Sequence, residues 1–332
     1  MRETIYYWRR DYRWRDEEAR MNRLPQYRSS IDIEGYGDLN VHFVHSPSNS
    51  DKAIPLLFIH GWPGSFLEVS KALPALNAAG FHLVAPSLPG YGFSSIPPQP
   101  GFKMFHIAEL LHKLMIRLGY TTYVVQGGDW GAMIASTMAA SYHPSHIKAL
   151  HVNLFDAEKP AFSTEPAYTA FEKQSLAQHK DFDDNGFAYC MVQSSKPRTL
   201  GFAMHDSPIG MLAWTADKLH TWSDAYPWSS TELITWTLLH YLPGPTTAFQ
   251  IYRENSATEM VSGPKAGEYL RVPTGVSAFA KEAEMVPRCW AERRANVVFW
   301  REHGRGGHFA AYEKPEELVG DLVEFFGAVW EG

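Results

Sequence analysis

The first half of the chain alternates between short apolar runs and amphipathic segments. Runs with strand character cover residues 39–45, 53–59, 81–85, 121–125 and 147–154. Helical patterns lie between them, over 66–79, 106–118 and 132–142. Continuous apolar runs are typical of strands that are covered on both faces, and strands alternating with helices indicate right-handed crossovers. The pattern therefore predicts an α/β fold with a mostly parallel central sheet flanked by helices.

The alternation stops near residue 156. Residues 156–256 read as mainly helical, and strand patterns return only at 272–279 and 296–300, before a terminal amphipathic helix over 315–330. We therefore predict a helical lid inserted into a single core. The expected divisions are an N-terminal segment over 1–38, a core formed by 39–155 and 257–332, and a lid over 156–256.

Composition narrows the class of protein. With 332 residues, 45% of them apolar, the chain can bury a sizeable core. Its 30 basic residues against 36 acidic ones form no long run, which argues against a nucleic-acid partner. The only cysteines, Cys190 and Cys289, lack metal-ligand spacing, and we expect no metal and no cofactor.

The first residues lack the apolar region of a signal peptide, and no stretch is long and uncharged enough to span a bilayer. We therefore expect no integral membrane segment and a soluble, cytoplasmic protein. Its oligomeric state is left open, with a homodimer as one option.

The stretch from Gln126 to Gly131 carries the first candidate chemistry. It stands between a strand and a helix and has the layout of a nucleophile elbow, G-x-S-x-G, but an aspartate occupies the serine position. Gly127 and Gly131 keep side chains out of a turn too sharp to hold them. Asp129 is therefore the candidate nucleophile.

An elbow nucleophile needs a base and an acid, which follow in the chain order nucleophile, acid, histidine. Two histidines, His303 and His308, lie late enough. We prefer His308, because it follows a Gly-Gly pair and precedes the last helix. Glu282 and Glu284 both follow the 272–279 strand, and we prefer Glu282 as the acid because it is nearer the strand end, although a solvated pair with Lys281 is the ordinary alternative.

Backbone amides should complete the site. The expected oxyanion donors are the amides of Trp130, directly after Asp129, and of Trp62, in the loop after the 53–59 strand. We also expect the Trp62–Pro63 peptide bond to be cis, so that this loop aims an N–H inward.

A carboxylate nucleophile selects the reaction. It is already ionised at neutral pH, since an unperturbed aspartate has a pKa of about 3.9. It can attack an sp³ carbon and form an alkyl ester, which water activated by His308 then hydrolyses. Epoxides and alkyl halides fit this chemistry, whereas peptides and ordinary esters do not need a carboxylate nucleophile.

With these residues the chain resembles the microsomal-type epoxide hydrolases of the α/β-hydrolase superfamily over nearly its whole length. The motifs that carry the resemblance are Trp14–Tyr27 continuing into Val41–His45, His60–Ser65, Gly127–Gly131, Val272–Glu282 and Gly306–Ala311. The resemblance implies that two lid tyrosines, Tyr189 and Tyr252, hydrogen-bond the epoxide oxygen and protonate the leaving alkoxide. One residue departs from the family, because Ala280 stands where proline is frequent. We also expect the protein to lack the membrane anchor of some members, so the resemblance does not imply a microsomal location.

The resemblance thus implies an epoxide hydrolase that acts on a small apolar epoxide. Two alternatives stay open, a haloalkane or haloacid dehalogenase with the same nucleophile and a non-catalytic ligand-binding protein. Apolar residues that either line the pocket or form the lid core are Phe155, Phe162, Phe187, Met204 and Trp214.

Overall fold

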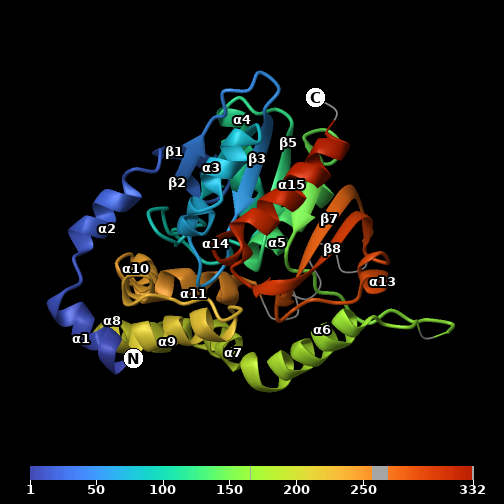
Figure 1. Ribbon diagram of the computed structural model, residues 1–332. Helices are drawn as coiled ribbons and strands as arrows, with labels where there is room; N and C mark the ends of the chain where they lie inside the picture. The colour runs from blue at the N-terminus through green and yellow to red at the C-terminus, as the bar shows by residue number, and fades with distance from the viewer. Residues whose placement is uncertain (165, 256–267, 331–332) are drawn as a thin grey trace.

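One eight-stranded sheet runs through the molecule (Figure 1) in the order β1-β2-β4-β3-β5-β6-β7-β8. The computed structural model describes residues 1–164, 166–255 and 268–330. The strands are β1 (Gln26–Ile33), β2 (Gly37–Ser46), β3 (Ile54–Ile59), β4 (Phe81–Pro86), β5 (Tyr123–Gly127), β6 (Ile147–Val152), β7 (Leu270–Lys281) and β8 (Ala295–Gly307). From β4 to β8 neighbouring strands are parallel, whereas β1 pairs antiparallel with β2, and β2 pairs antiparallel with β4. The predicted mostly parallel sheet is confirmed.

Helices cover both faces of this sheet, which explains why its central strands are apolar throughout. Helices α3 (Leu73–Ala78) and α15 (Pro315–Val329) pack together on one face, and α4 (Met104–Arg117) and α5 (Trp130–Tyr142) pack on the other. The helix predicted over 66–79 is broken into a 3₁₀ turn, Phe66–Ser70, and α3. Pro74 explains the break, because a proline has no amide hydrogen and fits only the first turn of a helix.

A second layer of helices lies across the end of the sheet at the bottom of Figure 1. It comprises α6 (Ala170–Asp181), a π-helical turn (Phe182–Gly186), α7 (Ala188–Ser195), α8 (Pro197–Asp206), α9 (Pro208–Thr221), α10 (Ser230–Tyr241) and α11 (Pro245–Glu254). This is the segment predicted as a lid. Its predicted end at residues 256–257 lies outside the described residues, so the division into lid and core stays a prediction.

The N-terminal segment reaches from this helical layer to the sheet. Helices α1 (Arg2–Arg10) and α2 (Trp14–Met21) precede β1, the edge strand of the sheet. The hydroxyls of Tyr7 and Tyr12 lie 2.8 and 3.1 Å from the hydroxyls of Thr231 and Thr235 on α10. The first residues of the chain are therefore tied to the helices that cover the site.

Two short helices complete the described part of the chain, α13 (Arg288–Ala291) and α14 (Ala310–Glu313). None of the helices in the described ranges has both the length and the apolar character needed to cross a bilayer.

Candidate active site

Asp129 stands at the turn between β5 and α5. Its backbone has φ 51° and ψ −133°, a conformation that is uncommon for a residue with a side chain and that here holds the carboxylate at the carboxyl edge of the sheet. The flanking glycines make the turn possible. A Cβ on Gly127 would lie 2.2 Å from the carbonyl oxygen of Gly131, and a Cβ on Gly131 would lie 2.0 Å from that of Ile59.

The loop after β3 delivers a hydrogen-bond donor to this carboxylate. The Trp62 amide donates to Asp129 Oδ1 at 2.7 Å, and the Trp62–Pro63 bond is cis, as expected. His60 holds the loop: its Nε2 accepts from the Leu88 amide at 3.1 Å, and its Nδ1 lies 2.9 Å from the Gly61 carbonyl. Burial lowers the pKa of His60 to about 4, so this imidazole is neutral and donates from Nδ1.

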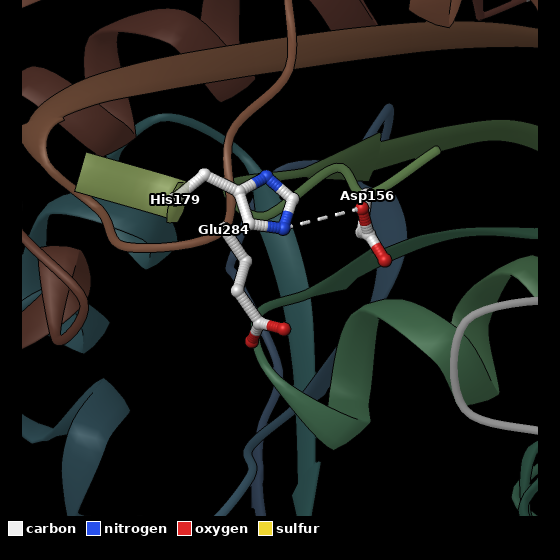
Figure 2. A group of neighbouring side chains, drawn as sticks. All are labelled: Asp156, His179 and Glu284. Carbon is white, nitrogen blue, oxygen red and sulfur yellow. Dashed lines mark ion pairs between the residues drawn. The ribbon is translucent and has the colours of Figure 1, made fainter. Parts of the chain in front are cut away.

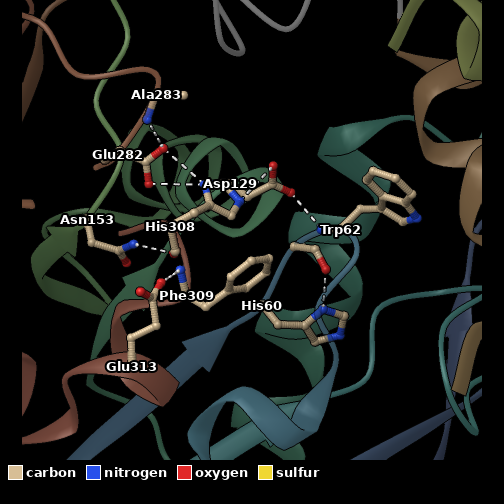
Figure 3. Close-up of polar contacts among 10 residues, drawn as sticks. His60, Trp62, Asp129, Asn153, Glu282, Ala283, His308, Phe309 and Glu313 are labelled. Carbon is tan, nitrogen blue, oxygen red and sulfur yellow. Dashed lines mark hydrogen bonds and ion pairs between the residues drawn. The ribbon is translucent and has the colours of Figure 1, made fainter. Parts of the chain in front are cut away.

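His308 reaches the same carboxylate from the end of β8 (Figure 3). Its Nε2 lies 3.6 Å from Asp129 Oδ2, and its Nδ1 lies 3.0 and 3.1 Å from the two carboxylate oxygens of Glu282. Burial alone would lower the pKa of His308, but the charge of Glu282, reinforced by Asp129, raises it well above the usual value. The imidazole is therefore held between two carboxylates.

The structure distinguishes the two candidate acids, Glu282 and Glu284, and the two candidate histidines, His303 and His308. Glu282 is fully buried with its carboxylate against His308 Nδ1, whereas the carboxylate of Glu284 lies beside Asp156 and His179 and makes no hydrogen bond to His308 among the described contacts. The strand predicted over 296–300 extends to Gly307, so His303 lies within β8 and not in the loop after it.

His303 belongs to a buried polar network on the far side of β8. Its Nε2 lies 2.6 Å from the buried carboxylate of Asp321 on α15. Asp321 also accepts hydrogen bonds from the Ser277 hydroxyl and the Arg301 guanidinium. This network holds α15 against β7 and β8.

The two tyrosines implied by the family resemblance lie over Asp129. Tyr189 on α7 stacks on the Trp62 ring at 5.2 Å between ring centroids, and Tyr252 on α11 meets the Trp130 ring edge-on at 4.9 Å. Burial, reinforced by the charge of Asp129, raises the pKa of both phenols well above the ordinary value. Both therefore stay protonated and can donate a hydrogen bond. An interaction with the Tyr252 hydroxyl opposes this rise for Tyr189, but no described residue meets the Tyr252 hydroxyl at full hydrogen-bond geometry.

For Trp130 and the candidate pocket residues, the contacts within the described ranges give no direct link to the Asp129 carboxylate. Trp130 begins α5, so its amide is one of the first helix donors, which have no partner within the helix. Phe187 packs against Phe182, which in turn meets Tyr189. Trp214 donates to Gln193 at 2.8 Å within the helical layer.

Phe155 is paired with Met285 beside the loop that carries Glu282. Met204 is buried in α8. The contacts of the described residues do not connect Met204 or Trp214 to Asp129, and their place in a substrate pocket stays a prediction.

Sequence reasoning missed several residues that support the site. The carbonyl oxygen of Trp222, just after α9, accepts a hydrogen bond from the His308 amide at 3.0 Å. The centroid of the Trp222 ring lies 5.0 Å from that of the His308 imidazole. Glu313 accepts from the Phe309 amide at 3.0 Å and is buried, and Asn153 lies beside the same turn (Figure 3). No local pattern marks these residues, because their partners are distant in sequence.

One group of side chains near the site could hold a metal ion. Ligand atoms of Asp156, His179 and Glu284 lie within 4.8 Å of one another. Figure 2 shows the His179 ring facing Asp156 at 3.8 Å, with the Glu284 carboxylate beside them. Burial, followed by the charge of Asp156, raises the pKa of Glu284 well above its ordinary value, which favours a protonated carboxyl over a metal ligand.

The fold and this site define an α/β-hydrolase with an aspartate at the nucleophile position. Two family models match the chain: one described as epoxide hydrolase N terminus over residues 1–69, and one described as alpha/beta hydrolase fold over 54–207.

Relatives of the whole chain agree with these matches. A putative epoxide hydrolase of Stigmatella aurantiaca is 38% identical over 97% of this chain and 74% of its own. Epoxide hydrolase 1 of Sus scrofa is 32% identical over 98% of this chain and 79% of its own. The protein belongs to the epoxide hydrolase family.

Solved structures give the same result. The Aspergillus niger epoxide hydrolase superposes with a TM-score of 0.88 at 35% identity, covering 99% of this chain and 84% of its own. The juvenile hormone epoxide hydrolase of the silkworm Bombyx mori superposes with a TM-score of 0.89 at 30% identity, covering 98% and 84%.

Proposed function

We propose that the protein is an epoxide hydrolase that opens an epoxide to a vicinal diol through an ester on Asp129. The observation that carries the proposal is the arrangement around this carboxylate. The Trp62 amide is 2.7 Å from one oxygen and His308 is 3.6 Å from the other. A nucleophile, a base with its orienting acid, and an oxyanion donor thus meet at one side chain.

In the first half of the reaction the Asp129 carboxylate attacks an epoxide carbon. The carbon–oxygen bond breaks, and the alkoxide takes a proton from Tyr189 or Tyr252. Both tyrosines belong to the helical layer and lie over the ring of Trp62. Acids placed in this way contribute roughly 10²–10⁴-fold to a rate. The product is an alkyl ester of Asp129 that carries a free hydroxyl.

In the second half His308 takes a proton from water, and the oxygen attacks the carbonyl carbon of the Asp129 ester. The negative charge develops on the ester oxygen that faces the Trp62 amide, and we propose that the Trp130 amide is the second donor to this oxygen. As the tetrahedral centre collapses, the bond to the alkyl oxygen breaks and this oxygen takes the proton of the newly added hydroxyl, which releases the diol and restores the Asp129 carboxylate. The imidazolium returns its proton through the site to the tyrosinate. Esterification prepares this step, because it removes the Asp129 charge that helps to raise the pKa of His308.

The substrate we propose is a small apolar epoxide. The side chains around the two tyrosines are aromatic: Trp62, Phe182, Trp222 and Phe249. Such walls favour apolar ligands and leave the two phenols as the polar groups that orient the epoxide oxygen. A homodimer and a cytoplasmic location remain predictions from the sequence.

The test is a single turnover of styrene oxide in H₂¹⁸O with enzyme in excess. We expect unlabelled diol and an ¹⁸O atom in the peptide that contains Asp129, because the new diol oxygen comes from the carboxylate. Label in the first diol would mean direct attack by water and would refute the ester mechanism.

Histidine variants test the assignment of the base. His308→Gln should accumulate the ester, visible as an adduct by intact-mass analysis. The matched control, His303→Gln, alters a histidine outside the site and should turn over at the wild-type rate per folded molecule.

One observation favours a second candidate, haloalkane dehalogenase. The indole Nε1 groups of Trp62 and Trp130 are buried and have no hydrogen-bond partner among the described residues. Such N–H groups could bind a leaving halide, whereas the paired phenols suit an alkoxide. Chloride or bromide release from haloalkanes, without diol formation from epoxides, would select this alternative.

A further inference from the structure

A second carboxyl group lies beside the candidate nucleophile and has no part in the mechanism above. Glu68 belongs to the 3₁₀ turn that directly follows the Trp62 loop, and it is partly buried. A Cβ built on Gly64 would lie 1.5 Å from Glu68 Oε1. The carboxyl group therefore occupies the space that a side chain at position 64 would take.

The nucleophile uses the same loop in the same way. A Cβ on Gly61 would lie 2.0 Å from Asp129 Oδ1. Two carboxyl groups thus rest on one four-residue loop, each filling the space above a glycine. Burial raises the pKa of Glu68 to about 8, opposed by the charge of His308 and reinforced by that of Asp129. The carboxyl group is therefore close enough to respond to the charges of the site.

The hydrolysis step leaves one hydrogen-bond requirement open. The attacking water must direct one O–H to His308 Nε2 and a lone pair to the carbonyl carbon of the Asp129 ester. Its second O–H needs an acceptor that fixes this orientation, since positioning of the reactants accounts for much of a rate enhancement. The ester oxygen facing the Trp62 amide is already engaged.

We propose that Glu68 is a positioning residue for ester hydrolysis, whose carboxyl oxygen accepts the second hydrogen of the water that His308 activates. A carboxyl group can do this whether ionised or protonated, because its carbonyl oxygen keeps free lone pairs. This assignment rests on the proposed function. The competing explanation is structural: the carboxyl group accepts a hydrogen bond from the Gly61 amide and only holds the loop.

The two half-reactions separate these explanations. Rapid-quench intact-mass analysis with styrene oxide gives the rate of ester formation and the rate of its hydrolysis for wild type, Glu68→Gln and Glu68→Leu. The glutamine keeps an oxygen acceptor and should hydrolyse the ester within about fivefold of wild type. The leucine leaves the water without its partner and should hydrolyse it about 10- to 100-fold more slowly. Ester formation should change less than about threefold in both variants.

A second variant moves the carboxyl group without removing it. Gly64→Ala places a methyl group where Glu68 Oε1 lies, so hydrolysis should slow while ester formation continues. The assignment is wrong if ester formation and hydrolysis fall together in Glu68→Leu, or if hydrolysis stays within about threefold of wild type. Failure of the wild-type enzyme to form any ester would instead overturn the proposed function.

Discussion

Replacing Tyr252 with phenylalanine should make the protein more stable and less active. The Tyr252 side chain is completely buried, and its hydroxyl interacts with Tyr189 but meets no described residue at full hydrogen-bond geometry. A buried polar group left unsatisfied costs about 1–3 kcal/mol, and Tyr252→Phe removes it without changing the ring. Loss of an acid should also slow ester formation, by about 10- to 100-fold because Tyr189 remains.

The expected stabilisation can be expressed as a melting temperature. Unfolding entropy is about 2.1 cal/mol/K per residue, which gives about 0.7 kcal/mol/K for a chain of 332 residues. A gain of about 1–3 kcal/mol therefore raises Tm by about 1.5–4 °C. Differential scanning calorimetry measures this shift. The effect on ester formation is measured by comparing the rate of adduct formation on the His308→Gln variant with that on the His308→Gln/Tyr252→Phe double variant.

Tyr123 supplies the matched control. It is equally buried, but its hydroxyl lies 2.8 Å from His112 Nδ1, far from the site. Tyr123→Phe should therefore lower the stability by about 1 kcal/mol and leave turnover unchanged. A drop in Tm for Tyr252→Phe as large as that of the control would refute the reasoning, because it would show that the Tyr252 hydroxyl has a partner in the free enzyme.

Three further predictions concern single side chains. Glu282→Gln removes the main charge that raises the pKa of His308, so ester hydrolysis should slow by about 10²-fold or more, measured by rapid quench, with the adduct accumulating. Gly61→Ala places a methyl group 2.0 Å from Asp129 Oδ1 and should abolish adduct formation, whereas normal alkylation would contradict the described loop. Asp321→Asn should cost about 3–5 kcal/mol in urea unfolding at neutral pH. Burial alone would raise the pKa of Asp321, but hydrogen bonds from His303 and Ser277 lower it below its ordinary value of 3.8. The stabilisation by Asp321 is therefore complete above pH 3.8 and is lost as the pH falls through the pKa of the folded state. An Asp321→Asn variant as stable as wild type at pH 7 would contradict this.

The comparison of the sequence with the structure shows which features are local. The elbow could be predicted because its geometry is encoded within the five residues Gly127–Gly131, which stand between a strand and a helix. The same holds for the parallel sheet, since apolar runs and helical periodicity are properties of single segments. The break at Pro74 was missed because the apolar pattern continues through it.

The choice between neighbouring candidates could not be made with the same certainty. Glu282 and Glu284 are two residues apart and chemically alike, and only the packing of the end of β7 against His308 distinguishes them. His303 and His308 differ because β8 continues to Gly307 and turns only there. Strand ends are set by partner strands, which a local pattern does not reveal.

The sequence by itself determined a carboxylate at an elbow, and with it the kind of bond that the protein can form. The tertiary structure decided what surrounds that carboxylate. Trp222 reaches His308 across 86 residues, and the Glu68 carboxyl group fits against the loop that carries Trp62 because Gly64 leaves it room. The physical reason is that a turn is fixed by the steric limits of a few bonded residues, whereas the environment of a buried charge is the sum of contacts from segments that only folding brings together.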